Sequence, residues 1–185
     1  MKVGKKRIGV LIGKNGEVKE ELENKFGLNI KIDSKTGFVQ IKPNKEHPNY
    51  EPFNKLIVNR IIKAISRGFN PNKALRLIDE NYQLQVINLV KILGKSDKKL
   101  KRIKGRLIGR DGEMRSAIEQ FAECFVSIYG KTISIIADYE NMSIARKAIN
   151  MLIEGTPHHV VLKFLEKKYN ERKKARFREM YKPEF

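Results

Sequence analysis

The sequence contains no tryptophan, one cysteine and no apolar run long enough to span a lipid bilayer. A membrane-spanning helix needs roughly 18 or more consecutive apolar residues, so we expect no membrane insertion. A single cysteine has no partner for a disulfide within the chain, and Cys124 stands in an apolar, strand-like pattern typical of a small buried side chain. The first residues form no apolar signal segment, which together with the lone thiol predicts a cytoplasmic protein.

Aromatic residues amount to 8% of the chain and are not clustered. This scarcity argues against the aromatic stacking platforms of RRM domains and single-strand-binding OB domains. Phe125 and Tyr129 are candidates for stacking a base, with packing within a strand as the alternative.

The sequence also lacks the patterns of a catalytic or metal site. Its histidines, His47, His158 and His159, show no metal-ligand spacing with Cys124 or with a carboxylate cluster. Segment 9–14 lacks the spacing and the hydroxyl of a phosphate-binding P-loop, and no nucleophile stands at a spacing typical of activation by a base. We therefore expect no enzymatic activity, no metal and no cofactor.

Positive charge is what the sequence has in excess. The 39 lysines and arginines face 21 acidic residues, which gives a formal net charge of +18 and a pI near 10.0. Such a surface attracts polyanions, and nucleic acid and anionic membrane are the two candidates. With 185 residues, 41% of them hydrophobic, the chain is long enough for one large packed domain or two small ones.

A short motif occurs twice, 96 positions apart (109 minus 13), and decides between these two organisations. The pattern Leu-Ile-Gly-basic-x-Gly-Glu stands at 11–17 and again at 107–113. Apolar positions downstream correspond at the same offset: Leu22 with Ile118, Ile30 with Val126, and Ile32 with Ile128. Matching apolar positions behind both motifs indicate an internal repeat, and hence two domains of similar fold.

Each motif places two glycines three residues apart, directly before a predicted helix. Because glycine has no Cβ, the backbone can turn sharply there and approach a bulky ligand closely. The unpaired N–H groups and the positive dipole end of the following helix attract an anion. With a basic residue between the glycines, the loop suits the sugar-phosphate backbone of a single strand.

Hydrophobic periodicity and turn residues predict a similar order of elements in both halves. In the first half we expect helices at 5–12 and 17–25, strands at 28–32 and 38–42, a helix at 56–65 and a connecting helix capped by Asn70. In the second half we expect a strand at 82–93, helices at 96–104 and 113–122, strands at 124–129 and 132–137, and a helix at 139–153. Residues 1–3 leave room for only a stub of a first strand in the first half. A last helix at 158–180 is expected to dock with a solvated basic face, or to add phosphate contacts.

In these motifs and this element order the sequence resembles the type I KH domain, a β-α-α-β-β-α module for single-stranded nucleic acid. The resemblance implies an α+β fold with two type I KH domains, each a three-stranded sheet with helices on one face, and a basic C-terminal helix. The expected domains are 1–80, the first KH domain with its connector helix and a nearly absent first strand; 81–157, the second KH domain; and 158–185, the basic C-terminal helix.

The two Gly-x-x-Gly loops, the sequence Leu-Ile-Gly-Arg-Asp-Gly and a Gly-Thr-Pro at 155–157 are similar to a narrower group. They resemble archaeal relatives of the eukaryotic pre-ribosomal "partner of Nob" factor. This resemblance implies a role in pre-rRNA processing and small-subunit ribosome assembly, with single-stranded RNA near the 3′ end of the small-subunit rRNA as ligand. A Nob-type endonuclease or a pre-ribosomal subunit is then the expected partner. A scaffold that docks a nuclease or a translation factor, with RNA binding secondary, stays open as the alternative.

The KH loop holds the backbone of about four nucleotides, and apolar neighbours line a groove for the bases. Carried over residue by residue, the resemblance implicates Gly13, Lys14, Asn15 and Gly16 in the first domain and Gly109, Arg110, Asp111 and Gly112 in the second. The implied groove walls are Ile12 and Ile108, with contributions from Val18 and Met114.

Charge singles out the second loop. Segment 91–115 holds ten lysines and arginines against three acidic residues, and from it we add Lys104, Arg106 and Arg115 as expected RNA contacts. The helix after the first loop, in contrast, carries four glutamates between positions 17 and 23. We therefore expect the second domain to bind RNA more strongly than the first.

Overall fold

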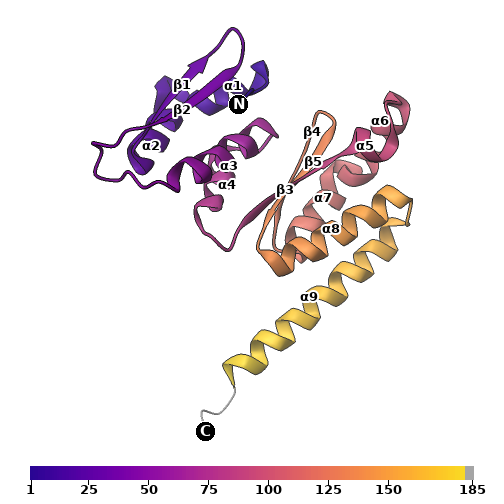
Figure 1. Cartoon of the computed structure of the whole chain (residues 1–185). Helices are drawn as coiled ribbons and strands as arrows, with labels where there is room; N and C mark the ends of the chain where they lie inside the picture. Colours follow the sequence, from indigo (N-terminus) through magenta and orange to yellow (C-terminus); the bar gives the residue numbers. More distant parts are fainter. Residues whose placement is uncertain (182–185) are drawn as a thin grey trace. The chain divides into compact units, whose positions relative to one another are not determined.

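The structure is a computed structural model that describes residues 1–181; the final four residues of the expected C-terminal domain, 182–185, lie outside the described residues. The fold is α+β, and the chain divides into two compact units, Met1–Leu84 and the part from Gln85 onward (Figure 1). Each unit contains one of the two Gly-x-x-Gly loops, between two of its helices.

The first unit is a two-stranded sheet covered by helices. Its elements are α1 (Lys5–Ile12), the 3₁₀ turn η1 (Lys14–Gly16), α2 (Glu17–Phe26), β1 (Leu28–Asp33), β2 (Phe38–Pro43), α3 (Asn54–Ser66), α4 (Pro71–Ala74) and η2 (Leu75–Ile78). The strands pair antiparallel, with Ile30 opposite Ile41. Alternate strand residues are buried, as period-2 patterning requires, and α2 and α3 pack against the strands.

A short edge forms beside β2 in this unit. The N–H groups of Met1 and Val39 each donate to the other's carbonyl, at 2.7 and 2.8 Å, and the Val3 N–H donates to the Gly37 carbonyl at 2.8 Å. Lys2 forms an antiparallel bridge with Phe38. Residues 1–3 thus occupy the place of a first strand, with pairing limited to these residues.

The second unit has a full three-stranded sheet. Its elements are β3 (Gln83–Asn88), α5 (Leu89–Leu93), α6 (Asp97–Ile108), η3 (Arg110–Gly112), α7 (Glu113–Phe121), β4 (Phe125–Tyr129), β5 (Thr132–Ala137), α8 (Tyr139–Glu154) and α9 (His158–Met180). The strand order is β3-β5-β4, and β4 pairs antiparallel with β5. The central strand, β5, is buried along its whole length, and its side chains join those of the helices in one core.

The helix and strand predictions are confirmed apart from one element and small shifts of the ends. The expected caps form: the side chains of Asn70, Ser96 and Asp138 each accept a hydrogen bond from a backbone N–H in the first turn of the following helix. The helix expected at 96–104 runs on to Ile108, so it leads directly into the second loop.

The strand expected at 82–93 is wrong in its second half. β3 ends at Asn88, whose side chain accepts a hydrogen bond from the Val90 N–H at 2.9 Å and caps the short helix α5. Gly94, with φ 76°, ends that helix. A short run of Leu, Val and Ile does not distinguish strand from helix by periodicity, and the Asn cap was the signal that settles it.

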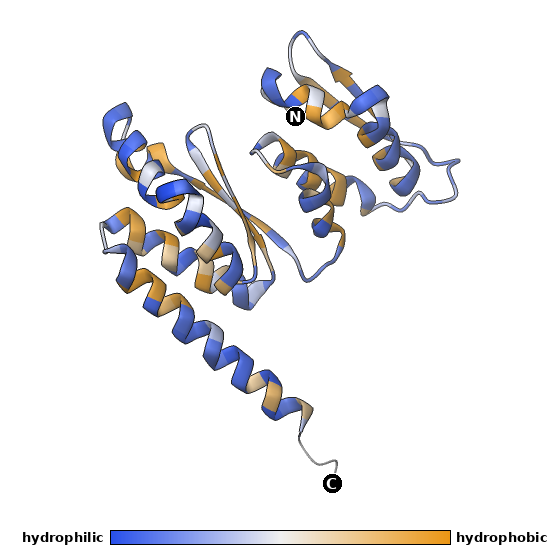
Figure 2. Cartoon of the chain, turned by 180° about the vertical axis from the view of Figure 1, so that it is seen from behind, coloured by the Kyte–Doolittle hydropathy of each residue, from blue (hydrophilic) through white to orange (hydrophobic). Residues whose placement is uncertain are grey.

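The last helix is confirmed at His158–Met180. Val161 and Leu165 are fully buried, and α9 packs along α7 and α8. The hydropathy colours of Figure 2 show apolar residues along the sheet strands and α8, and a mainly hydrophilic distal part of α9. In the described chain, residues 1–181, no helix combines the length and the apolar character needed to cross a membrane.

Candidate nucleic-acid interface

The two loops, which we call the first loop (13–16) and the second loop (109–112), have the same backbone conformation. Gly13 and Gly109 have φ/ψ of 80°/177° and 75°/−179°. Gly16 and Gly112 have 92°/−2° and 84°/7°. All four conformations lie in regions that favour glycine. The repeat in the sequence is therefore a repeat in geometry.

The third residue of each loop is not glycine and yet is left-handed. Asn15 has φ/ψ of 54°/18° and Asp111 has 50°/19°. Asn and Asp are the side chains that tolerate this conformation best, because they can hydrogen-bond locally. Asp111 thus has a backbone role, which accounts for an acidic residue in a loop expected to face phosphate.

The first glycine of each loop packs against the helix that follows. A Cβ on Gly109 would lie 2.7 Å from both the backbone N and the Cβ of Met114, and a Cβ on Gly13 would lie 2.6 Å from Cγ2 of Val18. In contrast, a Cβ on Gly112 would meet nothing within 4 Å. The first glycine closes each loop onto its helix, and Gly112 leaves the surface of the second loop open.

The loops present their middle residues and a helix N-terminus. Lys14, Asn15, Arg110 and Asp111 are exposed. No side chain of the described residues caps α7, which begins directly after Gly112. Its first N–H groups and positive dipole end therefore face the loop, as a phosphate site requires.

The predicted groove walls differ in their placement. Ile108, directly before the second loop, is 39% exposed and offers apolar surface to a ligand. Ile12 is half-buried at the corresponding place in the first unit. Met114 is 3% exposed and lies beneath Gly109, so it supports the loop from the core.

Arg115 lies on the side of α7 that faces the strand β4. Its Nε is 3.8 Å from Oε2 of Glu119, and Oε1 of Glu119 accepts a hydrogen bond from the Val126 N–H at 2.8 Å. The first unit repeats this arrangement, with Lys19 3.5 Å from Glu23 and Glu23 accepting from the Ile30 N–H. In both units a glutamate thus links a cation of its own helix to the backbone of the neighbouring strand.

Two other residues predicted to contact RNA donate hydrogen bonds to backbone carbonyls of the protein. Arg106 donates from Nε to the Leu152 carbonyl at 3.3 Å and from Nη2 to the Thr156 carbonyl at 2.7 Å, which satisfies the C-terminal end of α8. Lys104 donates to the Gly130 carbonyl in the β4–β5 turn at 3.2 Å. The geometry gives Arg106 a structural role that no motif in the sequence signals.

The surroundings of the two loops differ in charge. A Cβ on Gly16 would lie 3.4 Å from Oε1 of Glu20, so a carboxylate stands beside the first loop. The corresponding residue behind the second loop is Ser116 (116 minus 20 is 96). Exposed lysines and arginines of α6 precede the second loop: Lys98, Lys99, Lys101 and Arg102. The charges around the loops therefore favour an anion more at the second loop than at the first.

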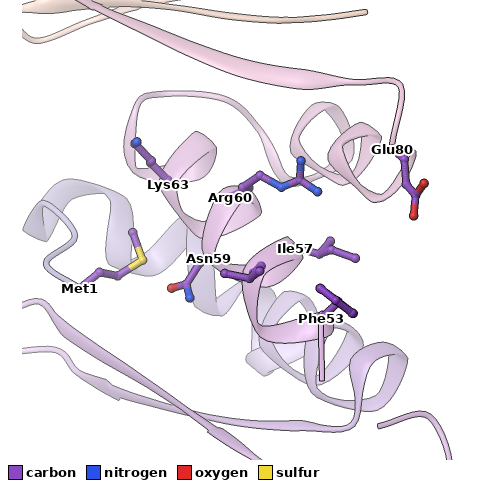
Figure 3. Close-up of a pocket in the computed structure, with 8 residues that line it drawn as sticks. Met1, Phe53, Ile57, Asn59, Arg60, Lys63 and Glu80 are labelled. Atoms are coloured by element: carbon purple, nitrogen blue, oxygen red, sulfur yellow. The ribbon is translucent and has the colours of Figure 1, made fainter. Parts of the chain in front are cut away.

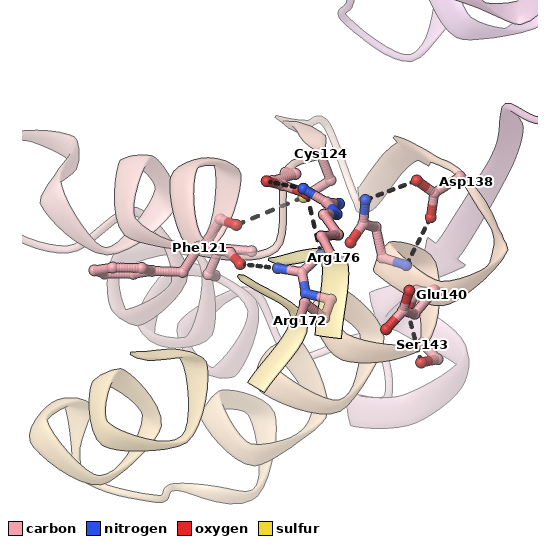
Figure 4. A network of polar contacts seen from close by, with 10 residues as sticks. Phe121, Cys124, Asp138, Glu140, Ser143, Arg172 and Arg176 are labelled. Carbon is pink, nitrogen blue, oxygen red and sulfur yellow. Dashed lines mark hydrogen bonds and ion pairs between the residues drawn. The ribbon is translucent and has the colours of Figure 1, made fainter. Parts of the chain in front are cut away.

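The end of α7 away from the second loop is fixed to α9 by an ion cluster (Figure 4). Arg172, 6% exposed, lies 3.3 Å from Glu123 Oε2 through Nη1 and donates to the Phe121 carbonyl through Nη2. Arg176 binds both oxygens of Glu123, at 3.0 and 2.6 Å, and this hydrogen bonding lowers the pKa of Glu123. Because α7 starts at the second loop, α9 braces the helix on which that loop depends.

Each unit has a hollow in its surface that could take part of a ligand. One of about 370 Å³ adjoins the second loop between the starts of α7 and α9, and Arg110 and His158 are among its lining residues. A larger one of about 680 Å³ lies in the first unit, away from the first loop (Figure 3). It is mainly apolar, with Phe53, Leu56 and Ile57 among the residues that line it.

The remaining candidate residues have ordinary placements. Cys124 is 5% exposed with its thiol 3.6 Å from the Ile118 carbonyl, which confirms a small buried side chain. Phe125 and Tyr129 are half-buried in β4. Within residues 1–181, no group of three or more His, Cys, Asp and Glu side chains is placed to hold a metal ion.

Comparison with protein families gives a match over residues 83–170 to the model of the second PNO1 KH domain, described as "Eukaryotic type KH-domain (KH-domain type I)". A KH domain-containing protein of Methanocaldococcus jannaschii is 39% identical over 177 residues, which cover 96% of this chain and 76% of that protein. The RNA-binding protein pno1 of Dictyostelium discoideum is 32% identical over 82% of this chain, which spans 63% of the length of that relative.

A solved structure has a similar fold along nearly the whole chain. It is the a/eIF2alpha-aDim2p-rRNA complex from Pyrococcus horikoshii, in which the matching chain is 41% identical with a TM-score of 0.85. The match covers 92% of this chain and 93% of that one.

Proposed function

The chain belongs to the KH-domain family of PNO1 and archaeal Dim2 proteins, and we propose that it binds single-stranded RNA in the 3′ region of small-subunit rRNA through its Gly-x-x-Gly loops. In this proposal it is a non-catalytic cytoplasmic factor of rRNA processing and ribosome assembly. It acts on the pre-ribosomal subunit, together with a Nob-type endonuclease.

The second loop carries this proposal. It combines an exposed turn, left-handed at Asp111, with an α7 N-terminus that no described side chain caps. Basic residues of α6 lie before it and Arg115 lies behind it. Backbone N–H donors, the positive dipole end of α7 and cations thus lie together at one exposed loop. These are the groups that bind the sugar-phosphate backbone of a nucleic acid.

Relatives support the ligand class. One relative, of Dictyostelium discoideum, is named for RNA binding; the protein PNO1 of Coccidioides immitis, 28% identical over 70% of this chain, is named for pre-rRNA processing; and a structural neighbour is a complex with rRNA. The 3′ region, the use of the loops and the endonuclease partner are our own proposals.

The test is the charge-reversing substitution Arg110→Asp, which makes the second loop Gly-Asp-Asp-Gly. The left-handed position is already Asp111, so the backbone keeps its conformation and the change is confined to an exposed side chain. We expect loss of most binding to an unpaired oligonucleotide from the 3′ end of small-subunit rRNA. In the wild type, about six phosphate contacts predict a slope near −4 in log affinity against log salt.

Lys14→Asp with Asn15→Asp is the matched change in the first loop, and it should weaken binding less. Circular dichroism should show both variants folded. Wild-type affinity of a folded Arg110→Asp variant would contradict the proposed site.

A scaffold that docks a translation factor is a second candidate, because the neighbouring solved complex contains a/eIF2alpha as well as rRNA. It predicts that the purified cognate factor binds this chain with equal affinity before and after nuclease treatment. Loss of that binding on RNA digestion would reject the scaffold and leave RNA binding as the primary function.

A further inference from the structure

The distal part of α9 leaves the body of the second unit. Val161 and Leu165 anchor its first half in the core. Its last contacts with the body of the unit are the ion pairs of Arg172 and Arg176 with Glu123. Figure 1 shows α9 extending past α7 and α8. At its end three large apolar side chains are 57%, 75% and 69% exposed: Phe177, Met180 and Tyr181. This segment, residues 173–181, we call the arm; within it Arg176 still binds Glu123.

Cations and an aromatic ring share one side of the arm. Lys173, Lys174, Phe177 and Arg178 stand at i, i+1, i+4 and i+5, which places them on one helix face. With Asn170 they line a shallow hollow of about 380 Å³. The arm therefore has an open surface in which a flat apolar ring is surrounded by positive charge.

The charge on this face is not neutralised within the described chain. Two nearby carboxylates have other partners: Glu171 lies 2.7 Å from Lys168, and Glu123 binds Arg172 and Arg176. Glu179, beside Arg178, contributes one negative charge to the arm. Among residues 1–181, no carboxylate forms an ion pair with Lys173, Lys174 or Arg178. Such a surface attracts a polyanion, which releases its own counterions on binding.

We infer that the arm is a second RNA-contact surface, whose cations hold phosphates while Phe177 stacks a base. The inference rests on the proposed function and extends it, because the arm takes RNA that continues beyond the second loop. Stacking on an aromatic ring beside a basic track is how single strands are held without sequence preference. Phe177 is supported for this by Tyr181, whose ring centroid lies 4.5 Å away.

The brace at Glu123 sets the position of the arm. Arg172 is bound to the C-terminal end of α7, and the second loop adjoins the N-terminal end of the same helix. The nine residues of α7 span about 14 Å at 1.5 Å per residue. The loop itself holds about four nucleotides. RNA must therefore be longer than that footprint to contact both surfaces.

Length dependence gives the test. Affinities are measured for unpaired RNA of about 5 and about 15 nucleotides, the shorter matching the loop footprint alone. The variants are Lys173→Gln/Lys174→Gln/Arg178→Gln and, separately, Phe177→Ala. Lys35→Gln/Lys45→Gln/Lys55→Gln is the control, since it removes three exposed charges from the first unit. Arg110→Asp reports on the loop.

If the arm contacts RNA, its triple variant should weaken binding of the long RNA. The slope of log affinity against log salt should become shallower by about 2, from three contacts at about 0.7 each. Phe177→Ala should cost about 5-fold or more on the long RNA, from the loss of one stacked base. Neither change should alter the short RNA, and the control should keep wild-type affinity for both lengths.

Two outcomes overturn the inference in different ways. If the arm variants bind the long RNA like the wild type while Arg110→Asp loses both lengths, the arm does not contact RNA, and an acidic protein surface becomes its ligand. If Arg110→Asp binds both lengths like the wild type, the proposed function itself fails, and the arm as an extension of that site fails with it.

Discussion

Glu123 has the left-handed backbone of Gly27, the residue 96 positions before it (123 minus 27), with φ of 46° against 59°. Both residues follow the helix that begins at a Gly-x-x-Gly loop. A side chain in this conformation costs roughly 1–2 kcal/mol relative to glycine. In the second unit the carboxylate at this position binds Arg172 and Arg176, which offsets that cost. Where the first unit has Gly27, the second unit thus has a glutamate whose side chain holds α9.

Glu123→Gln should destabilise the second unit by about 2 kcal/mol. The change leaves Arg172, 6% exposed, without its charge partner, and breaking a buried pair is costly. The expected loss is smaller than for a fully buried ion pair because the Glu123 side chain is 33% exposed. Urea unfolding followed by circular dichroism measures the change.

Glu123→Gly is the matched variant. It removes the same carboxylate but also relieves the left-handed strain, so it should be about 1 kcal/mol more stable than Glu123→Gln. If the glutamine variant equals the wild type, the cluster does not hold α9.

Acid should loosen the same contact. Hydrogen bonding from Arg176 lowers the pKa of Glu123, so the folded state favours the ionised carboxylate. Its stabilisation is complete above the ordinary glutamate pKa of about 4.3 and is lost as pH falls below that value through the lowered folded pKa. Stability measured from pH 7 to pH 3 should therefore fall more steeply in the wild type than in Glu123→Gln. If stability falls equally with pH in both proteins, the lowered pKa of Glu123 is contradicted.

Local signals in the sequence were sufficient for most of the fold. Asn70, Ser96 and Asp138 are caps because their side chains accept backbone N–H groups close by in the sequence, and such contacts depend on spacing alone. The loops are predictable for the same reason, since two glycines and a left-handed Asn or Asp are a local requirement. Asn88 is the counterexample: the apolar run around it predicts one continuous strand, whereas its side chain caps a helix.

Contacts between distant residues were not predictable in this way. Arg106 was expected at RNA, yet its guanidinium binds carbonyls 46 and 50 residues away, at the end of α8. Glu123 and Arg172 meet across 49 residues. Neither pairing leaves a periodic pattern. The one sequence signal was the repeat itself, in which Glu123 replaces Gly27 and Ser116 replaces Glu20.

Gly109→Ala should disrupt the second loop far more than Gly112→Ala. At Gly109 the conformation is one that is essentially restricted to glycine, and the added Cβ would lie 2.7 Å from Met114. We expect a loss of about 3 kcal/mol and of RNA affinity. At Gly112 the Cβ would meet nothing within 4 Å, so strain alone costs about 1 kcal/mol. Thermal or urea unfolding of both variants checks the ranking, and equal losses would contradict it.

The carboxylate beside the first loop should reduce the affinity of that loop for RNA. Oε1 of Glu20 stands 3.4 Å from where a Gly16 Cβ would be, whereas Ser116 brings no charge to the second loop. A charge near a phosphate in a solvated site is worth about 1 kcal/mol, or roughly fivefold in affinity. Glu20→Ser should therefore raise RNA affinity about fivefold when measured in the Arg110→Asp background, which silences the second loop.

The reciprocal change, Ser116→Glu in the wild type, should lower affinity by a similar factor and lose that effect at high salt, because screening weakens an exposed charge. If Ser116→Glu binds RNA as the wild type does, a carboxylate at this position does not decide between the loops, and the difference between the units must come from the basic residues of α6.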